Sequence, residues 1–323
     1  MSLKKYILAL CVACGCLSAG AFTIVIDPGH GGKDYGCVGK LTNEKTIVLD
    51  VSKRLGKILT DEHPEIKQVF TRSDDRFVSL NDRARIANKA NADIFVSIHV
   101  NSIDKKTRGR EAVHGASVYT LGLHRSDDNL EVAMRENSVI ELEQDYTETY
   151  QGFDPTSSES YILFELVQNS HLQQSIELAD GIQRQLVTTG KRADKNVRQS
   201  GFLVLRATSM PAVLVELDFI CNPEAERFLA SEQGRQAMAR SIANAVGDYY
   251  AHRQAEKQQL QAQSSAAAKT AANANTPEYI VTAPEGTPEI DSPTFKTLKD
   301  AKKFLPKAKQ YNPQAFIKKI GDE

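Results

Sequence analysis

From Phe22 to about Tyr250, short runs rich in β-branched residues alternate with longer segments whose apolar residues recur at helical spacing. This alternation is typical of an α/β domain in which helices connect mostly parallel strands. The runs expected to form strands are Phe22 to Ile26, Lys67 to Thr71, Ile94 to Ile98, Ala116 to Thr120, Phe202 to Leu205 and Ala212 to Glu216. The chain is therefore expected to build a mostly parallel sheet flanked by helices.

Three segments depart from this alternation. Residues 127–170 begin with a stretch rich in Asp and Glu and are expected to form a helical insertion. Residues 253–277 are mainly Gln, Ala, Ser, Asn and Thr, which bury too little apolar surface to order a chain, so we expect a flexible linker. Apolar and basic residues return in residues 278–323, which are expected to form a small C-terminal tail.

The N-terminus has the pattern of a secretory signal peptide at residues 1–21. Two lysines precede an apolar run at residues 7–13, and small residues follow up to Ala21. We expect cleavage after Ala21, export to the periplasm or cell envelope, and no stable membrane span in the mature chain. The alternatives are an uncleaved anchor and a lipoprotein modified at Cys14 or Cys16.

Charge and cysteine content limit the partners of the chain. It contains 40 Lys and Arg against 41 Asp and Glu, so nothing favours nucleic acid or an anionic membrane surface as a partner. Cleavage after Ala21 would leave Cys37 and Cys221 in the mature protein. Free buried thiols are the favoured interpretation, and a single disulfide or remote metal ligands are the alternatives.

Two histidines follow expected strands. His30 lies in the glycine-rich turn Asp27 to Gly32 after the first strand, and His99 ends the apolar run that begins at Ile94. Open α/β sheets bind ligands at the carboxyl ends of their strands, and glycine lets another group approach closely. Either histidine alone could be a hydrogen-bonded core residue, but two in equivalent positions indicate a shared site.

Two glutamates are expected at the same edge of the sheet. Glu44 follows the helix-capping residue Asn43, and the helix dipole alone explains an acidic residue in a first turn. Glu216 interrupts a strand apolar enough to be buried on both faces, where a carboxylate needs a partner such as Arg206 or a chemical role. Taken together, these side chains match a catalytic zinc site, which needs three ligands, an open position for water and a general base.

Six segments, in order along the chain, resemble the motifs of the zinc-dependent N-acetylmuramoyl-L-alanine amidases. They are Ile26 to Gly32, Asn43 to Lys45, Thr71-Arg72, Leu80 to Arg83, Ser97 to Asn101 and Val215 to Glu224. The resemblance extends from Thr23 to Tyr250 and implies a twisted six-stranded sheet and a catalytic domain at residues 22–252.

The resemblance also implies the chemistry. One Zn²⁺ would be bound by His30, Glu44 and His99, and Glu216 would be the catalytic carboxylate. The substrate would be peptidoglycan, cut at the amide bond between N-acetylmuramic acid and L-alanine.

In the cell-division members of this family, a similarly placed insertion carries a helix that covers the active site until an activator protein displaces it. The resemblance therefore implies autoinhibition, and a role in wall remodelling or daughter-cell separation. Glu141, Glu143 and Glu148 are the residues expected to cover or bind the metal, although a solvated acidic surface is the commoner meaning of such a run. The tail at residues 278–323 resembles part of a SPOR peptidoglycan-binding module.

Two other functions remain compatible with these residues. A zinc carboxypeptidase would need a cation for the terminal carboxylate of its substrate, and Arg72, Arg83 and Arg85 are the candidates, although a structural role is favoured for Arg83 and Arg85. A non-catalytic wall-binding protein would be expected to have lost one of the four chemical positions, yet all four are occupied. The sequence contains no phosphate-binding Gly-Lys-Ser loop, dinucleotide-binding glycine spacing or serine nucleophile elbow.

Overall fold

The computed structural model describes residues 21–123, 126–166, 170–274 and 278–320. The chain forms two compact units, which divide between His252 and Arg253. The predicted signal peptide lies outside the described residues, apart from Ala21. No helix within the described ranges is long and apolar enough to cross a membrane.

A six-stranded sheet forms the centre of the first unit, with the strand order β2-β1-β3-β6-β4-β5. The strands are β1 (Thr23–Pro28), β2 (Lys67–Phe70), β3 (Ile94–Asn101), β4 (Ala116–Leu121), β5 (Asp194–Ser200) and β6 (Ala212–Phe219). Strands β2, β1, β3 and β6 are parallel, whereas β4 pairs antiparallel with β6 and parallel with β5. The carboxyl ends of β1, β3 and β6 therefore meet at one edge, and the predicted mostly parallel sheet is confirmed.

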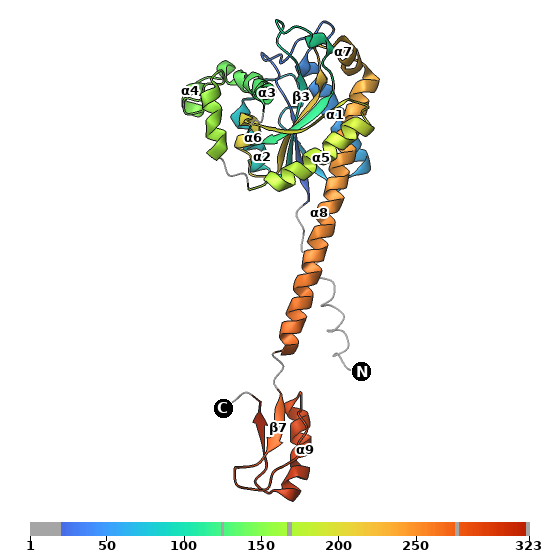
Figure 1. Ribbon diagram of the computed structural model, residues 1–323. Coiled ribbons are helices and arrows are strands. Elements are labelled where there is room, and N and C mark those ends of the chain that lie inside the picture. The colour runs from blue at the N-terminus through green and yellow to red at the C-terminus, as the bar shows by residue number, and fades with distance from the viewer. Residues whose placement is uncertain (1–20, 124–125, 167–169, 275–277, 321–323) are drawn as a thin grey trace, which may run out of the picture. The chain divides into compact units, whose positions relative to one another are not determined.

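Helices cover both faces of this sheet (Figure 1). One face is covered by α1 (Glu44–Glu62), α5 (Leu172–Thr188), α7 (Pro223–Ala230) and the first part of α8 (Glu232–Ala274). The other is covered by α2 (Leu80–Lys89), α3 (Asp127–Asn137) and α6 (Leu203–Arg206). The remaining short helices are η2 (Arg110–Ala112), η3 (Ser138–Leu142), α4 (Tyr146–Thr149) and η4 (Ser158–Leu166). Residues 127–166 thus contain four helices, α3, η3, α4 and η4, joined by turns, as the sequence predicts for a helical insertion.

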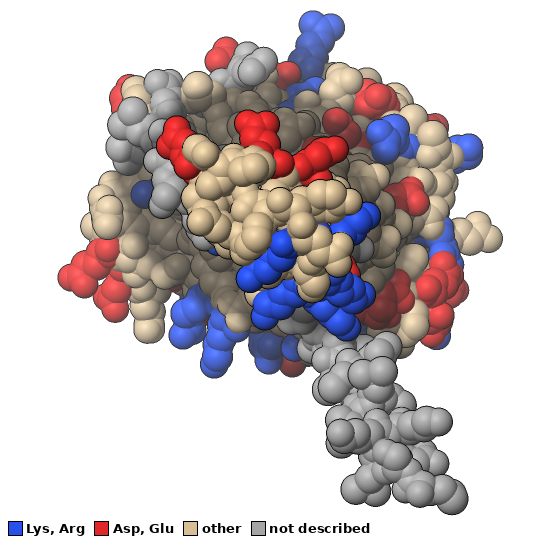
Figure 2. Space-filling model, turned by 90° about the horizontal axis from the view of Figure 1, so that it is seen from below, with Lys and Arg blue, Asp and Glu red and all other residues tan. Residues whose placement is uncertain are grey.

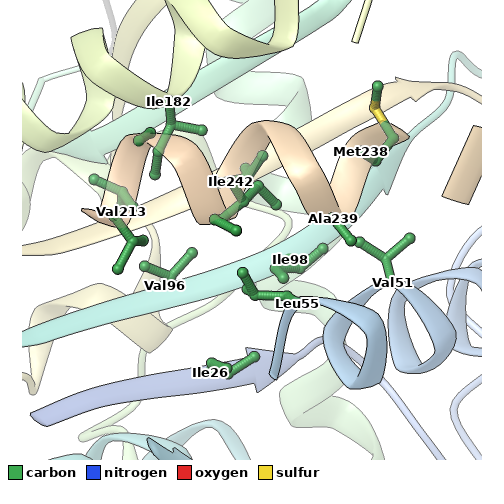
Figure 3. Packing of buried hydrophobic residues seen from close by; sticks show 14 of the residues in the cluster. Ile26, Val51, Leu55, Val96, Ile98, Ile182, Val213, Met238, Ala239 and Ile242 are labelled. Carbon is green, nitrogen blue, oxygen red and sulfur yellow. The ribbon is translucent and has the colours of Figure 1, made fainter. Parts of the chain in front are cut away.

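The larger hydrophobic core lies between the sheet and the helices α1, α5 and α8 (Figure 3). Ile26, Ile98 and Val213 of the strands pack there with Leu55 of α1 and Ile242 of α8, and all five side chains are fully buried. Each such side chain contributes roughly 1.5–3 kcal/mol when it leaves water. This core fixes the positions of the strands whose ends carry the site.

Strand alternation places the polar residues of the same strands on the opposite face. Ile26 and Ile98 point toward the larger core, so their neighbours Asp27, Ser97 and His99 point toward the side of α2 and α3. The polar side chains near the strand ends therefore gather on one face of the sheet.

The sixth strand differs from the prediction. The expected strand Phe202 to Leu205 is instead a helical turn that contains α6, and the edge strand is β5, Asp194–Ser200. A run of four apolar residues fits a buried helical turn as well as a strand, which explains the error. Strand β5 is polar and half-buried because it lies at the edge of the sheet.

The predicted flexible linker is also different, since α8 continues through it to Ala274. A helix that begins in a packed segment has already been nucleated, and each further residue adds one backbone hydrogen bond. The Ala, Gln and Lys residues that follow Arg253 are good helix formers. Composition correctly predicted that this segment is exposed to solvent, since side chains 257–266 are exposed. It wrongly predicted that the segment lacks regular structure, because these residues are helical.

The second unit also contains β7 (Tyr279–Thr282), α9 (Leu298–Tyr311) and β8 (Phe316–Lys319). Strands β7 and β8 pair antiparallel, and Val281, Ala308 and Ala315 form the buried centre of its small core.

Charges of both signs occur in several groups on the face of the molecule drawn in Figure 2, in keeping with the formal net charge of −1.

Candidate metal centre and active site

Four buried side chains meet at the carboxyl edge of the sheet, and each offers one metal-ligand atom within 4.8 Å of the others: His30, Glu44, His99 and Glu136. Glu44 Oε1 lies 3.0 Å from His30 Nε2 and 3.1 Å from His99 Nδ1. Glu136 Oε2 lies 3.2 Å from His30 Nε2 and 2.9 Å from His99 Nδ1. The structure thus brings together the three residues expected from the sequence and adds the carboxylate of Glu136 as a fourth.

This set of donors fits a zinc ion. In a tetrahedral site with metal–ligand bonds of about 2.0–2.2 Å, neighbouring ligand atoms are about 3.3–3.6 Å apart, slightly farther than here. The four separations here are 2.9 to 3.2 Å. His30 Nε2 and Glu136 Oε2 are buried and lack a hydrogen-bond partner among the described residues, as expected for atoms that bind a metal.

The turn after β1 holds His30 in an unusual backbone conformation. His30 has φ of 59°, in the left-handed region, which costs about 1–2 kcal/mol for a residue with a Cβ. Its Nδ1 lies 2.7 Å from Asp34 Oδ2, so the ring is oriented with Nε2 toward the other ligands. The neighbouring Gly29 is required by packing, because a Cβ there would lie 2.4 Å from the His99 ring.

The position of Glu44 fits both interpretations given for it, an acidic residue in the first turn of a helix and a metal ligand. It is the first residue of α1, which Asn43 caps by accepting a hydrogen bond from Thr46 N. Its Oε1 accepts from Val100 N and its Oε2 from Cys37 N, both at 2.8 Å. Burial alone would raise the pKa of Glu44, but the positive charge of His30 together with hydrogen bonds from His30 and His99 lowers the pKa to about 2. The group is therefore a carboxylate at neutral pH.

Glu216 lies beside these ligands. It is opposite His99 in the register of β3 and β6, it is fully buried, and neither oxygen accepts a hydrogen bond within the described part of the chain. Burial, and then the negative charge of Glu136, raises the pKa of Glu216 to about 8. The cation near Glu216 is Arg135, with Nη2 at 3.7 Å from Oε1, rather than the Arg206 considered from the sequence.

Helix α3 of the insertion supplies both Arg135 and Glu136 to this site. Arg135 donates to Ser102 O at 2.7 Å and to Asn101 Oδ1 at 3.0 Å, so it is anchored to the end of β3. Its Nε also lies 3.1 Å from Glu136 Oε1. Burial alone would lower the pKa of His99, but Glu136 outweighs this and raises the pKa to about 9. The insertion thus places one cation and one anion inside the site.

The glutamates expected to cover the metal lie elsewhere. None of Glu141, Glu143 and Glu148 belongs to the ligand group. Glu141 is exposed at the rim of a cavity beside the site, Glu143 accepts hydrogen bonds from Leu80 N and the Tyr150 hydroxyl, and Glu148 is exposed on α4. The sequence does contain a signal for Glu136, since it shares helical spacing with four other buried residues: Val132, Ala133, Asn137 and Ile140.

A cavity of about 660 Å³ opens beside His30 and Glu136. Its wall also contains Lys105, Lys106 and Arg110, which belong to the segment after β3. The insertion forms the opposite wall through Ser138, Val139, Glu141 and Leu142. With Arg135 of α3, a substrate at the metal centre therefore has an adjoining space lined by four Lys and Arg side chains.

Both cysteines of the described chain are free. Cys37 is half-buried in the wall of this cavity, and Cys221 is buried. Neither belongs to the group of metal-ligand atoms. The structure agrees with free thiols rather than a disulfide, although Cys37 is half-buried and not buried as expected.

Fold and site together define a class of α/β proteins with two histidines and a glutamate, grouped so that they could hold a metal, at the carboxyl edge of a mostly parallel sheet. A family model described as N-acetylmuramoyl-L-alanine amidase matches residues 24–248. N-acetylmuramoyl-L-alanine amidase AmiA of Escherichia coli K12 is 35% identical over 236 residues, which cover 72% of this chain and 78% of that relative.

Solved structures show the same fold. A crystal structure of an N-acetylmuramoyl-L-alanine amidase from Clostridium difficile 630 matches with a TM-score of 0.52 and 28% identity, covering 71% of this chain and 97% of that one. The catalytic domain of the amidase CwlV from Bacillus (Paenibacillus) polymyxa var. colistinus matches with a TM-score of 0.51 and 28% identity, covering 71% and 98%. The chain belongs to the N-acetylmuramoyl-L-alanine amidases, which are hydrolases that act on peptidoglycan.

Proposed function

We propose that the protein is a zinc-dependent amidase that cuts the bond between N-acetylmuramic acid and L-alanine, with a resting state closed by its own insertion. His30, Glu44 and His99 bind the zinc, and Glu216 is the general base. The observation that carries this proposal is the buried cluster of two histidines and Glu44, with Glu216 directly opposite His99.

The side chains divide the chemistry between them. A zinc ion bound at this site supplies Lewis acidity, which polarises the scissile carbonyl and makes a coordinated water acidic near neutral pH. The oxygens of Glu216 accept no hydrogen bond from the described residues, which supports a role in taking a proton from the attacking water and passing it to the leaving nitrogen. Departure of Glu136 would remove a negative charge from beside Glu216, which favours the carboxylate form that a base requires.

The closed state depends on Arg135 and Glu136. Glu136 contacts His30 and His99 and would fill the ligand position that a catalytic zinc keeps for water, and Arg135 lies beside the proposed base. Helix α3 therefore blocks the metal and the base at once. Activity requires α3 to move. The family resemblance implies that an activator protein displaces it.

The three arginines considered as binding sites for the terminal carboxylate of a carboxypeptidase substrate are not placed for that role. Arg72 and Arg83 are buried and bound to backbone carbonyls, and Arg85 is exposed and paired with Asp82. None of the three reaches into the cavity beside the metal centre. The basic side chains that do, Lys105 and Lys106 among them, suit the anionic peptide of the substrate.

The proposed setting is the cell envelope. The N-terminal pattern supports export to the periplasm or cell envelope by a signal peptide. The wall substrate and the autoinhibitory insertion together support a role in wall remodelling or daughter-cell separation. For residues 278–323 we propose a wall-binding role of the SPOR type.

Zinc content and products from peptidoglycan test this function, with the mature wild type compared with Glu216→Gln. We expect about one zinc in both proteins, and a rate of stem-peptide release about 10²- to 10⁴-fold lower in the variant. Exposed Glu111→Gln is the matched control. Mass analysis separates free stem peptide, made by an amidase, from loss of a terminal residue, made by a carboxypeptidase. A wild type without zinc, or a fully active Glu216→Gln, would overturn the proposal.

A further inference from the structure

Two of the family motifs, Thr71-Arg72 and Leu80 to Arg83, contain arginines that contribute no atom to the metal cluster. We propose that Arg72 and Arg83 are positioning residues, which hold the turn that carries His30 by binding three consecutive backbone carbonyls. The inference rests on the proposed function only in naming zinc as the ion that His30 binds.

The hydrogen bonds of the two guanidinium groups converge on this turn. Arg83 donates from Nη1 to Pro28 O and from Nη2 to His30 O, both at 2.7 Å. Arg72 donates from Nε to Pro28 O at 2.9 Å and from Nη2 to Gly29 O at 2.6 Å. Both side chains are almost completely buried. The carbonyls of Pro28, Gly29 and His30 are therefore all satisfied by arginine.

The turn needs such donors because it leaves the sheet while still buried. Buried carbonyls without a partner are strongly unfavourable, and the left-handed His30 breaks the regular hydrogen-bond ladder of β1. With both arginines in place, the conformation that directs His30 Nε2 at the metal also satisfies these carbonyls. A relaxed turn would lose these bonds and move the ligand.

Charge compensation supports a dedicated role for Arg83. Asp27, in the same turn, accepts a hydrogen bond from Arg83 Nη1 at 2.7 Å, and the hydroxyls of Thr71 and Ser97 also donate to it. Arg83 and these hydroxyls hold the pKa of Asp27 below its usual range although burial opposes this. The carboxylate thus neutralises the buried guanidinium and leaves its remaining donors for the carbonyls.

Arg72 also connects two proposed ligands. Besides Gly29 O, its Nη2 donates to Lys45 O at 3.1 Å, in the first turn of α1 next to Glu44. Its Nη1 donates to Asp74 O at 3.0 Å. One guanidinium therefore joins the His30 turn to the helix that begins with Glu44. Lysine cannot replace it, because a single ammonium does not reproduce the planar fork of five N–H donors.

The test compares zinc affinity, measured by chelator competition, in the full chain and in Arg72→Lys and Arg83→Lys. We expect each variant to bind zinc about 10- to 100-fold more weakly, the range for partners that orient a metal ligand. Arg85→Lys is the matched control, because Arg85 lies on the same helix as Arg83 but is exposed and paired with Asp82. Its zinc affinity should be unchanged. The visible spectrum of Co²⁺-loaded protein should change in the first two variants only.

Two further measurements separate positioning from general stability. A purely structural arginine would lower the unfolding free energy of the metal-free protein and leave the zinc affinity and Co²⁺ spectrum of the folded protein unchanged, which would overturn the inference. If the lysine variants fail to fold, Asp27→Asn removes the carboxylate that neutralises Arg83 and is expected to weaken zinc binding in the same range; unchanged affinity in that variant would equally overturn it.

A wild type that binds no zinc would contradict the proposed function but would still leave this inference open to test. Hydrogen exchange of the metal-free protein then decides whether Arg83 holds the turn. The amides of Gly29 and Gly31, which donate to Ile98 O and Asp34 O, should exchange about tenfold faster in Arg83→Lys than in Arg85→Lys. Equal exchange in the two variants would show that the turn does not depend on Arg83.

Discussion

The two halves of the metal cluster are held in different ways. His30, Glu44 and His99 belong to a sheet-edge half, in which buried strands, backbone amides and the Asp34 carboxylate fix each ligand. Glu136 belongs to an insertion half, and its carboxylate contacts only His30, His99 and Arg135 within the described residues. We therefore expect the sheet-edge half to keep its geometry without the insertion, whereas in the proposed function the carboxylate of Glu136 is held by the site that it blocks.

The attachment of α3 supports the same distinction. Its last residue, Asn137, donates to Gly201 O at 2.7 Å and to the Tyr161 hydroxyl at 3.1 Å, and accepts from Leu203 N at 2.9 Å. These bonds tie the end of the helix to the α6 side of the molecule, whereas Arg135 is the residue that bonds it to the end of β3. Under the proposed function the two halves have different roles, a permanent catalytic set and a removable inhibitor, so substitutions on the two sides should act in opposite directions.

The largest effect is expected on the sheet-edge side. His99→Ala removes one of three permanent ligands, so zinc affinity should fall on the order of 10³-fold or more, beyond the 10- to 100-fold loss typical for a partner of a ligand. Peptidoglycan hydrolysis should be lost with it. Zinc titration and product release measure both, and exposed His114→Ala is the matched control. Normal zinc binding by His99→Ala would show that the sheet-edge set is assigned wrongly.

A change of opposite sign is expected on the insertion side. Glu136→Ala removes the blocking carboxylate, so basal hydrolysis should rise about 5- to 150-fold, the range of a typical coupling free energy of 1–3 kcal/mol. The rate of stem-peptide release without any activator measures it. Glu131→Ala, an exposed position on the same helix, should leave the rate unchanged. A lower rate in a folded Glu136→Ala protein would make Glu136 a permanent ligand and remove the distinction between the halves.

The sheet-edge half could be predicted from the sequence because its residues interrupt strong patterns. His99 and Glu216 end or break apolar strands, and His30 follows a strand in a glycine-rich turn. Parallel strands bring such ends to one edge, so a local pattern is enough to predict a site formed by distant residues. The long α1 and β3 were predicted for the same reason, since their apolar periodicity is strong.

The insertion half was missed because its pattern is weak. Glu136 lies in a helix with many polar residues, and only its spacing with Val132 and Ile140 places it on the buried face. Strand β5 was missed for a similar reason, since an edge strand needs few apolar residues. Which of several acidic side chains reaches the metal depends on the path of the chain after β4, and residue type does not determine that path.

The smallest effects are expected for the acidic residues that the sequence alone favoured as the cover of the metal. Glu141→Gln and Glu148→Gln change exposed side chains outside the ligand group, so zinc affinity and basal hydrolysis should each change by less than about twofold, as for substitutions worth under 0.5 kcal/mol. Chelator competition and stem-peptide release, measured beside Glu136→Ala, check this. A rise in basal rate equal to that of Glu136→Ala would mean that the inhibitor is a broad acidic surface. An unchanged rate in both, with Glu136→Ala activated, would confine the inhibition to the one carboxylate that contacts His30 and His99.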